Sequence, residues 1–302
     1  MKLIEPSYEI IPQAPGLEGI YKQIELAGRV CYKSEDKITE NSAKDFTNRM
    51  VKSGHLAMCE HGTVYLSLPN GILDNLVNNN LVCKYTNNRH SICISYLKKE
   101  NENDIIGISK VAVTTNYRVL VENGWLSDLQ YQCEPTEYHE KRITVKFITD
   151  IGCGREILRH RVFSFANEST RYCNYSKGKF NNELTYIIPS WSIIKEGNYD
   201  DTFMIFSNRN TLTSQESCLL LYLKEVEKQY MLFVENDFKP QEARAILPLC
   251  TKSELVVTGF VSDWKHFFDL RTDIAKTGKP HPDLLQITNP LYEEFKNKQL
   301  IC

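Results

Sequence analysis

The sequence predicts a protein of mixed α/β class, of the α+β type, with helices and strands in one chain. Three stretches carry this prediction. Residues 17–32 repeat apolar side chains at helical spacing, and residues 143–149 alternate apolar and polar side chains as a half-buried strand does. Residues 213–235 form the longest helical pattern, with leucines and aromatic residues on one side.

The other elements are bounded by turn residues. A helix at about 42–53 ends at Gly54, and a helix at 241–247 lies between Pro240 and Pro248. Further helices are expected at about 152–160 and from Ser262, which we expect to cap its helix, and strands at 63–68, 184–188 and 254–261.

The domain organisation is predicted from the stretch with the least regular pattern of apolar residues. Residues 69–104 hold asparagine-rich and charged loops around one or two short elements, without a long apolar periodicity. We therefore expect a single domain over 1–302 with an inserted segment at about 70–142.

Composition excludes several classes of protein. The chain has 302 residues, 42% hydrophobic and 25% charged, which is typical of a soluble globular protein. A net charge of -2 gives no overall basic field for nucleic acid. No run of 18 apolar residues is present, and the N-terminus is too polar for a signal peptide, so we expect a cytoplasmic protein without membrane contact. Ten cysteines without a CxxC pair indicate reduced thiols and no metal site.

The stretch from Arg159 to Tyr172 has the densest chemistry in the chain. It holds three arginines, a histidine, two serines, an asparagine and a glutamate among aromatic and aliphatic residues. Arginines bind phosphate oxygens bidentately, and rings or guanidinium planes stack on planar ligands. This pattern favours a site for an anionic, planar ligand. The alternative is an exposed basic helix end that binds phosphate weakly or not at all.

Arg271 poses a second question. It continues a helical stripe formed by Trp264, Phe267 and Phe268 that would also include Ala275. An uncompensated arginine on an apolar face costs several kcal/mol, roughly, so Arg271 needs an anionic partner. That partner is either a ligand or an internal carboxylate. Arg244, set among alanines and Ile246, poses the same question more weakly.

No Rossmann, Walker, serine-hydrolase or zinc-protease motif occurs. The chain contains Arg159-His160-Arg161, followed by seven residues and then Ser169. This is the RHR-x7-S signature of the flavin-dependent thymidylate synthases, which this chain resembles. The resemblance extends to Thr170-Arg171-Tyr172 and to collinear segments at 27–31, 54–61, 243–248 and 270–271.

The resemblance implies an enzyme that makes dTMP from dUMP, with methylenetetrahydrofolate as carbon donor and FAD, reduced by NADPH, as hydride source. It also implies an antiparallel sheet flanked by helices, and a homotetramer whose sites are shared between subunits. Cys250 lacks the Pro-Cys-His context of the thiol-dependent thymidylate synthases, and a flavin route needs no protein nucleophile.

The resemblance assigns roles by position. Arg271 would stabilise charge at the uracil carbonyl as the catalytic residue. The residues implied for dUMP are Glu156, Arg159, Asn167, Glu168, Ser169, Thr170, Arg171, Arg244 and Arg271, and those for FAD are Glu60, Arg159, His160, Arg161, Asn167 and His266.

Some positions depart from the family pattern. Phe260 and Ser262 replace the family's N-x-R, and His266 stands where a family asparagine contacts FAD. Whether Asn167 or Glu168 faces the ligand, and whether His281 completes the site, stay open. Two other functions remain: a module that holds a nucleotide or RNA without chemistry, and a flavoprotein that has lost methyl transfer.

Overall fold

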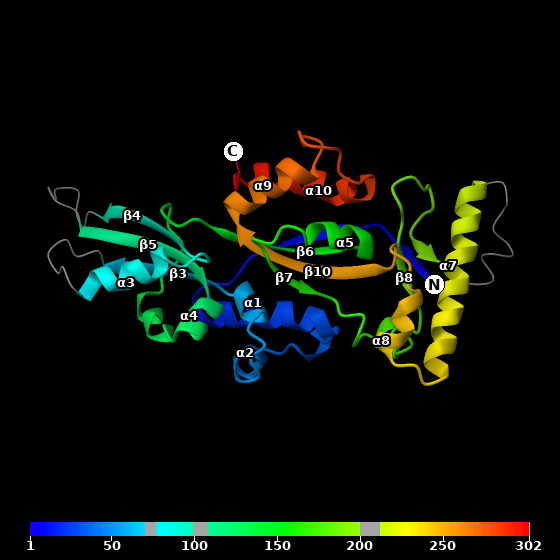
Figure 1. Ribbon diagram of the computed structural model, residues 1–302, viewed down its shortest axis with the longest axis horizontal. Coiled ribbons are helices and arrows are strands. Elements are labelled where there is room, and N and C mark those ends of the chain that lie inside the picture. Colours follow the sequence, from blue (N-terminus) through cyan, green and yellow to red (C-terminus); the bar gives the residue numbers. More distant parts are fainter. Residues whose placement is uncertain (70–76, 99–107, 200–211, 302) are drawn as a thin grey trace.

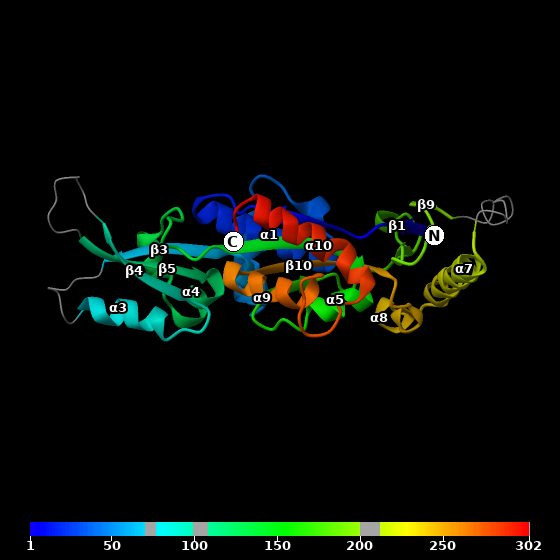
Figure 2. The same ribbon diagram turned by 90° about the horizontal axis from the view of Figure 1, so that it is seen from above.

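The computed structural model describes residues 1–69, 77–98, 108–199 and 212–301. It is an elongated molecule in which three small sheets follow one another along the long axis (Figures 1 and 2). Helices and strands are mixed throughout, which confirms the α/β class expected from the sequence.

The central sheet has four antiparallel strands in the order β2-β6-β10-β7. These strands are β2 (Ser7–Ile11), β6 (Arg142–Asp150), β10 (Lys252–Phe260) and β7 (Ser164–Asn167). β6 and β10 pair along their whole lengths, and their apolar residues are almost completely buried. The antiparallel sheet that the family resemblance implied is therefore present.

Helices cover both faces of this sheet (Figure 1). On one face lie α5 (Ile151–Ile157), α9 (Val261–Arg271) and α10 (Pro282–Asn297), around a core rich in aromatic side chains. On the other face lie α1 (Gly16–Tyr32) and α2 (Ser42–Lys52). Side chains of α1 pack against Val256 of β10, so the sheet is buried on both sides.

A second sheet, in the order β3-β5-β4, forms one end of the molecule. Its strands are β3 (Thr63–Pro69), β5 (Ile108–Asn116) and β4 (Ile92–Lys98), and α3 (Val77–Thr86) and α4 (Tyr117–Asn123) pack on it. The weakly patterned stretch 69–104 thus holds two elements among its described residues, as expected. Its core is continuous with the inner face of α1, so the sheet is attached to the centre of the fold.

The other end of the molecule is built on a three-stranded sheet in the order β8-β1-β9. Its strands are β8 (Thr185–Ile187), β1 (Lys2–Ile4) and β9 (Gly197–Asn198), of which β1 and β8 run parallel. The long helix α7 (Ser214–Glu235) and the short helix α8 (Pro240–Ala243) pack against it. Short 3-10 turns occupy Glu35–Lys37, Met58–His61, Leu126–Tyr131, Gly178–Phe180 and Arg244–Ile246.

Several helix boundaries differ from the sequence prediction. α5 ends at Ile157, before the expected end at 160, and the helix expected at 241–247 is the short α8 followed by a 3-10 turn. Both ends of α9 also differ. β10 runs into α9 without a loop, so Phe260 is the N-cap residue and Ser262 lies inside the first turn. The Ser262 amide instead donates to Glu140 at 2.9 Å. α9 ends at Arg271, so Ala275 is not part of the stripe, while Trp264, Phe267 and Phe268 are fully buried as expected.

Candidate functional site

The arginine-rich stretch leaves α5 and enters β7, and its side chains face in different directions. Arg159 and Arg161 are exposed on either side of His160, which is buried. Among the described residues, no carboxylate pairs with either arginine. Their guanidinium groups are therefore available to an anionic ligand.

His160 accepts a hydrogen bond at Nε2 from Nε of Arg271, at 3.0 Å. Burial, together with the nearby Arg271 and His266, lowers the pKa of His160 to about 4. His160 is therefore neutral at physiological pH, and with Nε2 acting as acceptor its proton lies on Nδ1.

Arg271 also donates through Nη1 to Oε2 of Glu156 at 2.9 Å, and through Nη2 to the Glu156 carbonyl at 3.3 Å. The side chain of Arg271 is 21% exposed and that of Glu156 is 34% exposed. Glu156 is therefore the internal carboxylate partner that we expected for an arginine on an apolar helix face. Since this carboxylate is open to solvent, a bound ligand can compete for the guanidinium.

A cavity of about 940 Å³ opens beside this ion pair, and Glu156 forms part of its wall. Trp191, Leu249 and Pro189 contribute apolar surface, and His281 lies on the same wall. The volume is within the range of small-molecule sites in proteins. Glu156 and His281, which the sequence left without a confirmed role, therefore line one cavity.

A second pair forms between Thr170 and Arg244, whose Nη1 donates to the threonine hydroxyl at 3.2 Å. The preceding residue, Ser169, is fixed by its amide, which donates to the Cys31 carbonyl at the end of α1 at 2.9 Å. Arg171 is exposed, and the only contact of its guanidinium among the described residues is the ring of Tyr172 at 5.4 Å. Residues far apart in sequence thus meet around this turn.

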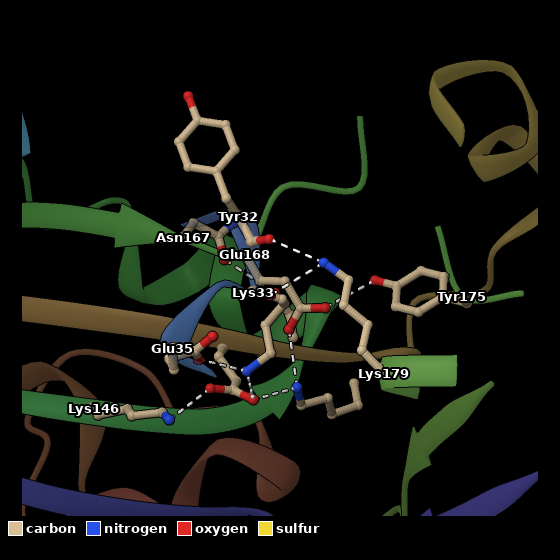
Figure 3. Close-up of polar contacts among 11 residues, drawn as sticks. Tyr32, Lys33, Glu35, Lys146, Asn167, Glu168, Tyr175 and Lys179 are labelled. Atoms are coloured by element: carbon tan, nitrogen blue, oxygen red, sulfur yellow. Dashed lines mark hydrogen bonds and ion pairs between the residues drawn. The ribbon is translucent and has the colours of Figure 1, made fainter. Parts of the chain in front are cut away.

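Asn167 and Glu168 point to opposite sides of the chain. Asn167, at the end of β7, is exposed and accepts a hydrogen bond from Ser253 at 3.0 Å. The Glu168 side chain is only 1% exposed; it accepts from the Tyr175 hydroxyl at 3.1 Å and pairs with Lys252 at 2.9 Å. Figure 3 shows Glu168 among neighbouring lysine and tyrosine side chains.

Lys252 also pairs with Glu254, at 2.5 Å, and Glu254 contacts Lys33 and Lys146 at 2.7 Å each. Burial alone would raise the pKa of Glu254, but Lys252 and Lys33 hold it well below its usual range. This lysine-glutamate network joins α1, β6 and β10 beneath the turn that carries Ser169.

A third group of residues lines a cavity of about 670 Å³ between the central sheet and the β3-β5-β4 sheet. Glu60 and Arg161, both implied for FAD, lie in its wall together with Phe260. His266 is not part of this wall; it is exposed, with its ring 6.4 Å from that of His160.

Sequence reasoning missed Arg89, Arg118 and Arg142 in this cavity. Arg118 binds Glu60 at 2.5 Å, and Arg142 donates to the Glu60 carbonyl at 2.9 Å. All three come from the segment at about 70–142 that the sequence set aside as an insertion. The pairing of β5 with β3 and β4, and of β6 with β10, brings these residues into the wall that also holds Arg161.

Residues 93–298 match the family model described as thymidylate synthase complementing protein, which covers most of the chain. The chain belongs to this family. Glu60 and the N-terminal segments at 27–31 and 54–61 lie outside the matched residues.

Relatives named flavin-dependent thymidylate synthase match parts of the chain. A probable one from Paramecium bursaria Chlorella virus 1 is 28% identical over 154 residues, 51% of this chain and 67% of the relative. One from Corynebacterium efficiens is 32% identical over 117 residues, 38% of this chain and 43% of the relative. One from Pyrococcus abyssi is 26% identical over 119 residues, 39% of this chain and 41% of the relative. The chain thus spans between about two fifths and two thirds of these relatives.

A solved structure of a UMP/dUMP methylase, PolB from Streptomyces cacaoi bound with 5-Br dUMP, aligns over 98% of this chain and 93% of that chain. Identity is 14% and the TM-score 0.43, a likeness too distant to bear on the site.

The described cysteines of this family member are all free thiols. Cys250 lies in the larger cavity, and burial raises its pKa to about 11, so it is protonated at neutral pH. In the described part of the chain, no group of three or more potential ligands could hold a metal ion. No helix there has the length and apolar character to cross a membrane.

Proposed function

We propose that this protein is a flavin-dependent thymidylate synthase, which makes dTMP from dUMP with methylenetetrahydrofolate, FAD and NADPH. The observation that carries the proposal is Arg271, held between Glu156 and His160 beside a cavity of about 940 Å³. Family membership and the names of the relatives support the same reaction.

The pyrimidine of dUMP would lie against Arg271 and Glu156. Methylation at C5 moves negative charge onto the uracil carbonyl, and a fixed guanidinium stabilises that charge strongly where water is excluded. The Glu156 carboxylate can accept a ring N–H. Because Glu156 is a third exposed, its pair with Arg271 can rearrange around a substrate without unfolding α5.

Neutral His160 has a positioning role in this arrangement. Its Nε2 accepts from Arg271 and so fixes the plane of the guanidinium. Because burial and the adjacent charges lower its pKa to about 4, His160 stays neutral at higher pH. A protonated His160 would lose this acceptor and repel Arg271.

The phosphate of dUMP would be bound by the turn at Ser169–Arg171 and by Arg244. The Thr170 hydroxyl already contacts Arg244, and the guanidinium of Arg171 has no acidic partner among the described residues. The amide of Ser169 is used by Cys31, so the serine hydroxyl and the two guanidinium groups are the donors left for a dianion.

The cavity of about 670 Å³ fits a flavin dinucleotide on chemical grounds. It combines arginine side chains, including Arg161, which has no acidic partner in the described part of the chain, with the ring of Phe260. Arg161, Arg159 and Glu60 would hold the cofactor. When bound, FAD supplies the hydride that completes the methyl group.

Three groups of candidate residues are separate within one chain. Among the described residues, no side-chain hydrogen bond or ion pair joins the Glu156–Arg271 pair, the Thr170–Arg244 pair and the cavity with Arg161. We therefore propose a homotetramer whose subunits share sites. Light scattering should give four times the mass of 35.0 kDa; a monomer that turns over would contradict the proposal.

The activity is tested by mixing the purified protein with FAD, NADPH, methylenetetrahydrofolate and dUMP labelled with tritium at C5. We expect dTMP and release of tritium that depend on every component. Bound flavin without tritium release would indicate a flavoprotein that has lost methyl transfer. Nucleotide binding without flavin would indicate a binding module.

A further inference from the structure

The cavity between the central sheet and the β3-β5-β4 sheet contains an arginine that no motif singled out. Arg89 lies in the turn between α3 and β4 and lines the same cavity as Arg161. Arg161 comes from the opposite side, between α5 and β7. Two arginines from separate turns thus line one cavity of about 670 Å³.

The turn that carries Arg89 is fixed by side chains on either side of it. Oδ1 of Asn88 accepts the amide of His90 at 2.9 Å, which closes the turn. The Ser91 hydroxyl donates to the hydroxyl of Thr115, a buried residue of β5, at 2.8 Å. Arg89 is therefore held at a defined place on the cavity wall.

The other two arginines of the cavity are already satisfied. Arg118 pairs with Glu60 at 2.5 Å and with Glu122 at 2.7 Å. Arg142 is half-buried and donates to the Glu60 carbonyl at 2.9 Å and to Ser164 at 3.2 Å. Arg118 thus neutralises Glu60 and Glu122, two of the three carboxylates in the wall; the third is Asp263.

Arg89 and Arg161 differ from this pair. Arg89 uses only Nε, which donates to Nε2 of His90 at 3.0 Å, and its terminal nitrogens have no partner among the described residues. Burial and the neighbouring Arg89 lower the pKa of His90, which fits its role as a neutral acceptor. The Arg161 side chain has no hydrogen-bonding or acidic partner in the described part of the chain. The terminal guanidinium nitrogens of both arginines therefore have no protein partner among the described residues.

The geometry points to a diphosphate. We propose that Arg89 and Arg161 together bind the diphosphate of the flavin dinucleotide, so that the β3-β5-β4 sheet forms part of the cofactor site. A diphosphate presents two charged groups to two guanidinium forks, and Phe260 offers an aromatic surface beside them. This inference rests on the proposed function. Arg89 itself lies outside the residues matched by the family model.

The test compares ligands with and without the diphosphate. Dissociation constants of FAD and riboflavin are measured by flavin fluorescence for the wild type, Arg89→Ala and Arg89→Lys. A charge-assisted hydrogen bond contributes about 1.5–3 kcal/mol, so Arg89→Ala should weaken FAD by about 10- to 100-fold and leave riboflavin unchanged. Arg89→Lys keeps the charge but not the fork, and should recover part of the loss.

Arg49→Ala is the matched control, because Arg49 is an exposed arginine on α2 that also lacks a carboxylate partner among the described residues and does not line this cavity. It should leave both constants unchanged. Thermal unfolding of each variant checks that the fold is intact.

The outcomes distinguish the role of Arg89 from the proposed enzyme function. Unchanged FAD affinity in Arg89→Ala, or an equal loss for riboflavin, overturns the inference while the proposed function stands. A wild-type protein that binds no flavin at all would refute the proposed function and this inference with it.

Discussion

Glu156 and Glu254 are both carboxylates paired with basic side chains, yet their surroundings differ in kind. Glu254 is 7% exposed and contacts three lysines, whereas Glu156 is 34% exposed and contacts one arginine at a cavity. A buried charge loses its hydration and depends on its partners, while an exposed pair can exchange partners with water or ligand at little cost. The comparison separates ion pairs that hold the fold from an ion pair that is available for function.

The largest effect on stability is expected when Lys252 is removed from the buried lysine-glutamate network. Lys252→Met leaves Glu168 and part of the charge on Glu254 without compensation, and should lower the free energy of unfolding by about 3 kcal/mol. Urea unfolding measures the change. Lys296→Met, which breaks an exposed pair with Glu293, is the control and should cost less than about 0.5 kcal/mol. Similar losses in both variants would show that burial does not distinguish the two regions.

Arg271→Ala should break function and spare the fold. Loss of a preorganised donor at a developing oxyanion costs roughly 100- to 1000-fold in turnover. FAD content should be close to normal, because Arg159 and Arg161 are unchanged, and Arg271→Lys should recover little since lysine lacks the planar fork. The measurements are dTMP yield, NADPH oxidation and flavin absorbance. An unfolded variant would make Arg271 a structural partner of Glu156, and full dTMP yield would mean that another arginine carries the role.

The pH dependence of stability sharpens the same comparison. The lysines depress the pKa of Glu254 in the folded state, so its stabilising contribution is complete above the unfolded value of about 4.3 and disappears as the pH falls. The stability difference between wild type and Glu254→Gln should therefore be largest at neutral pH and shrink in acid. Urea unfolding between about pH 7 and pH 3 measures it. A difference that stays constant would mean that the carboxylate charge does not contribute.

The smallest effect is expected for Cys250→Ala. Cys250 lies in the cavity with Glu156, but its thiol is protonated at neutral pH and a flavin route requires no thiolate. Turnover should stay within a few-fold of the wild type in the dTMP assay. Loss of activity with normal unfolding behaviour would point to thiolate chemistry in this cavity.

The elements with a local residue pattern could be predicted from the residues alone. The helices at 17–32 and 213–235 and the strand at 143–149 appear in the structure within one residue of the expected ends, because burial of one face imposes a period that neighbouring residues repeat. The RHR-x7-S stretch and its family were also evident. The strand β7 was not predicted, because only four residues carry its pattern. In the structure Asn167, at its end, is exposed and the next residue, Glu168, is buried.

The pairing of charged side chains depends on how the chain packs in three dimensions. Glu156 pairs with Arg271, more than a hundred residues away, and Glu254 pairs with Lys33 at the end of α1, because strand pairing and helix packing bring distant segments together. The same holds for Arg89 and Arg161, which line one cavity because β5 pairs with β3 and β4 across a weakly patterned stretch. This sheet shares its core with α1. Local periodicity contains no information about such contacts, since electrostatic complementarity acts through space and not along the chain.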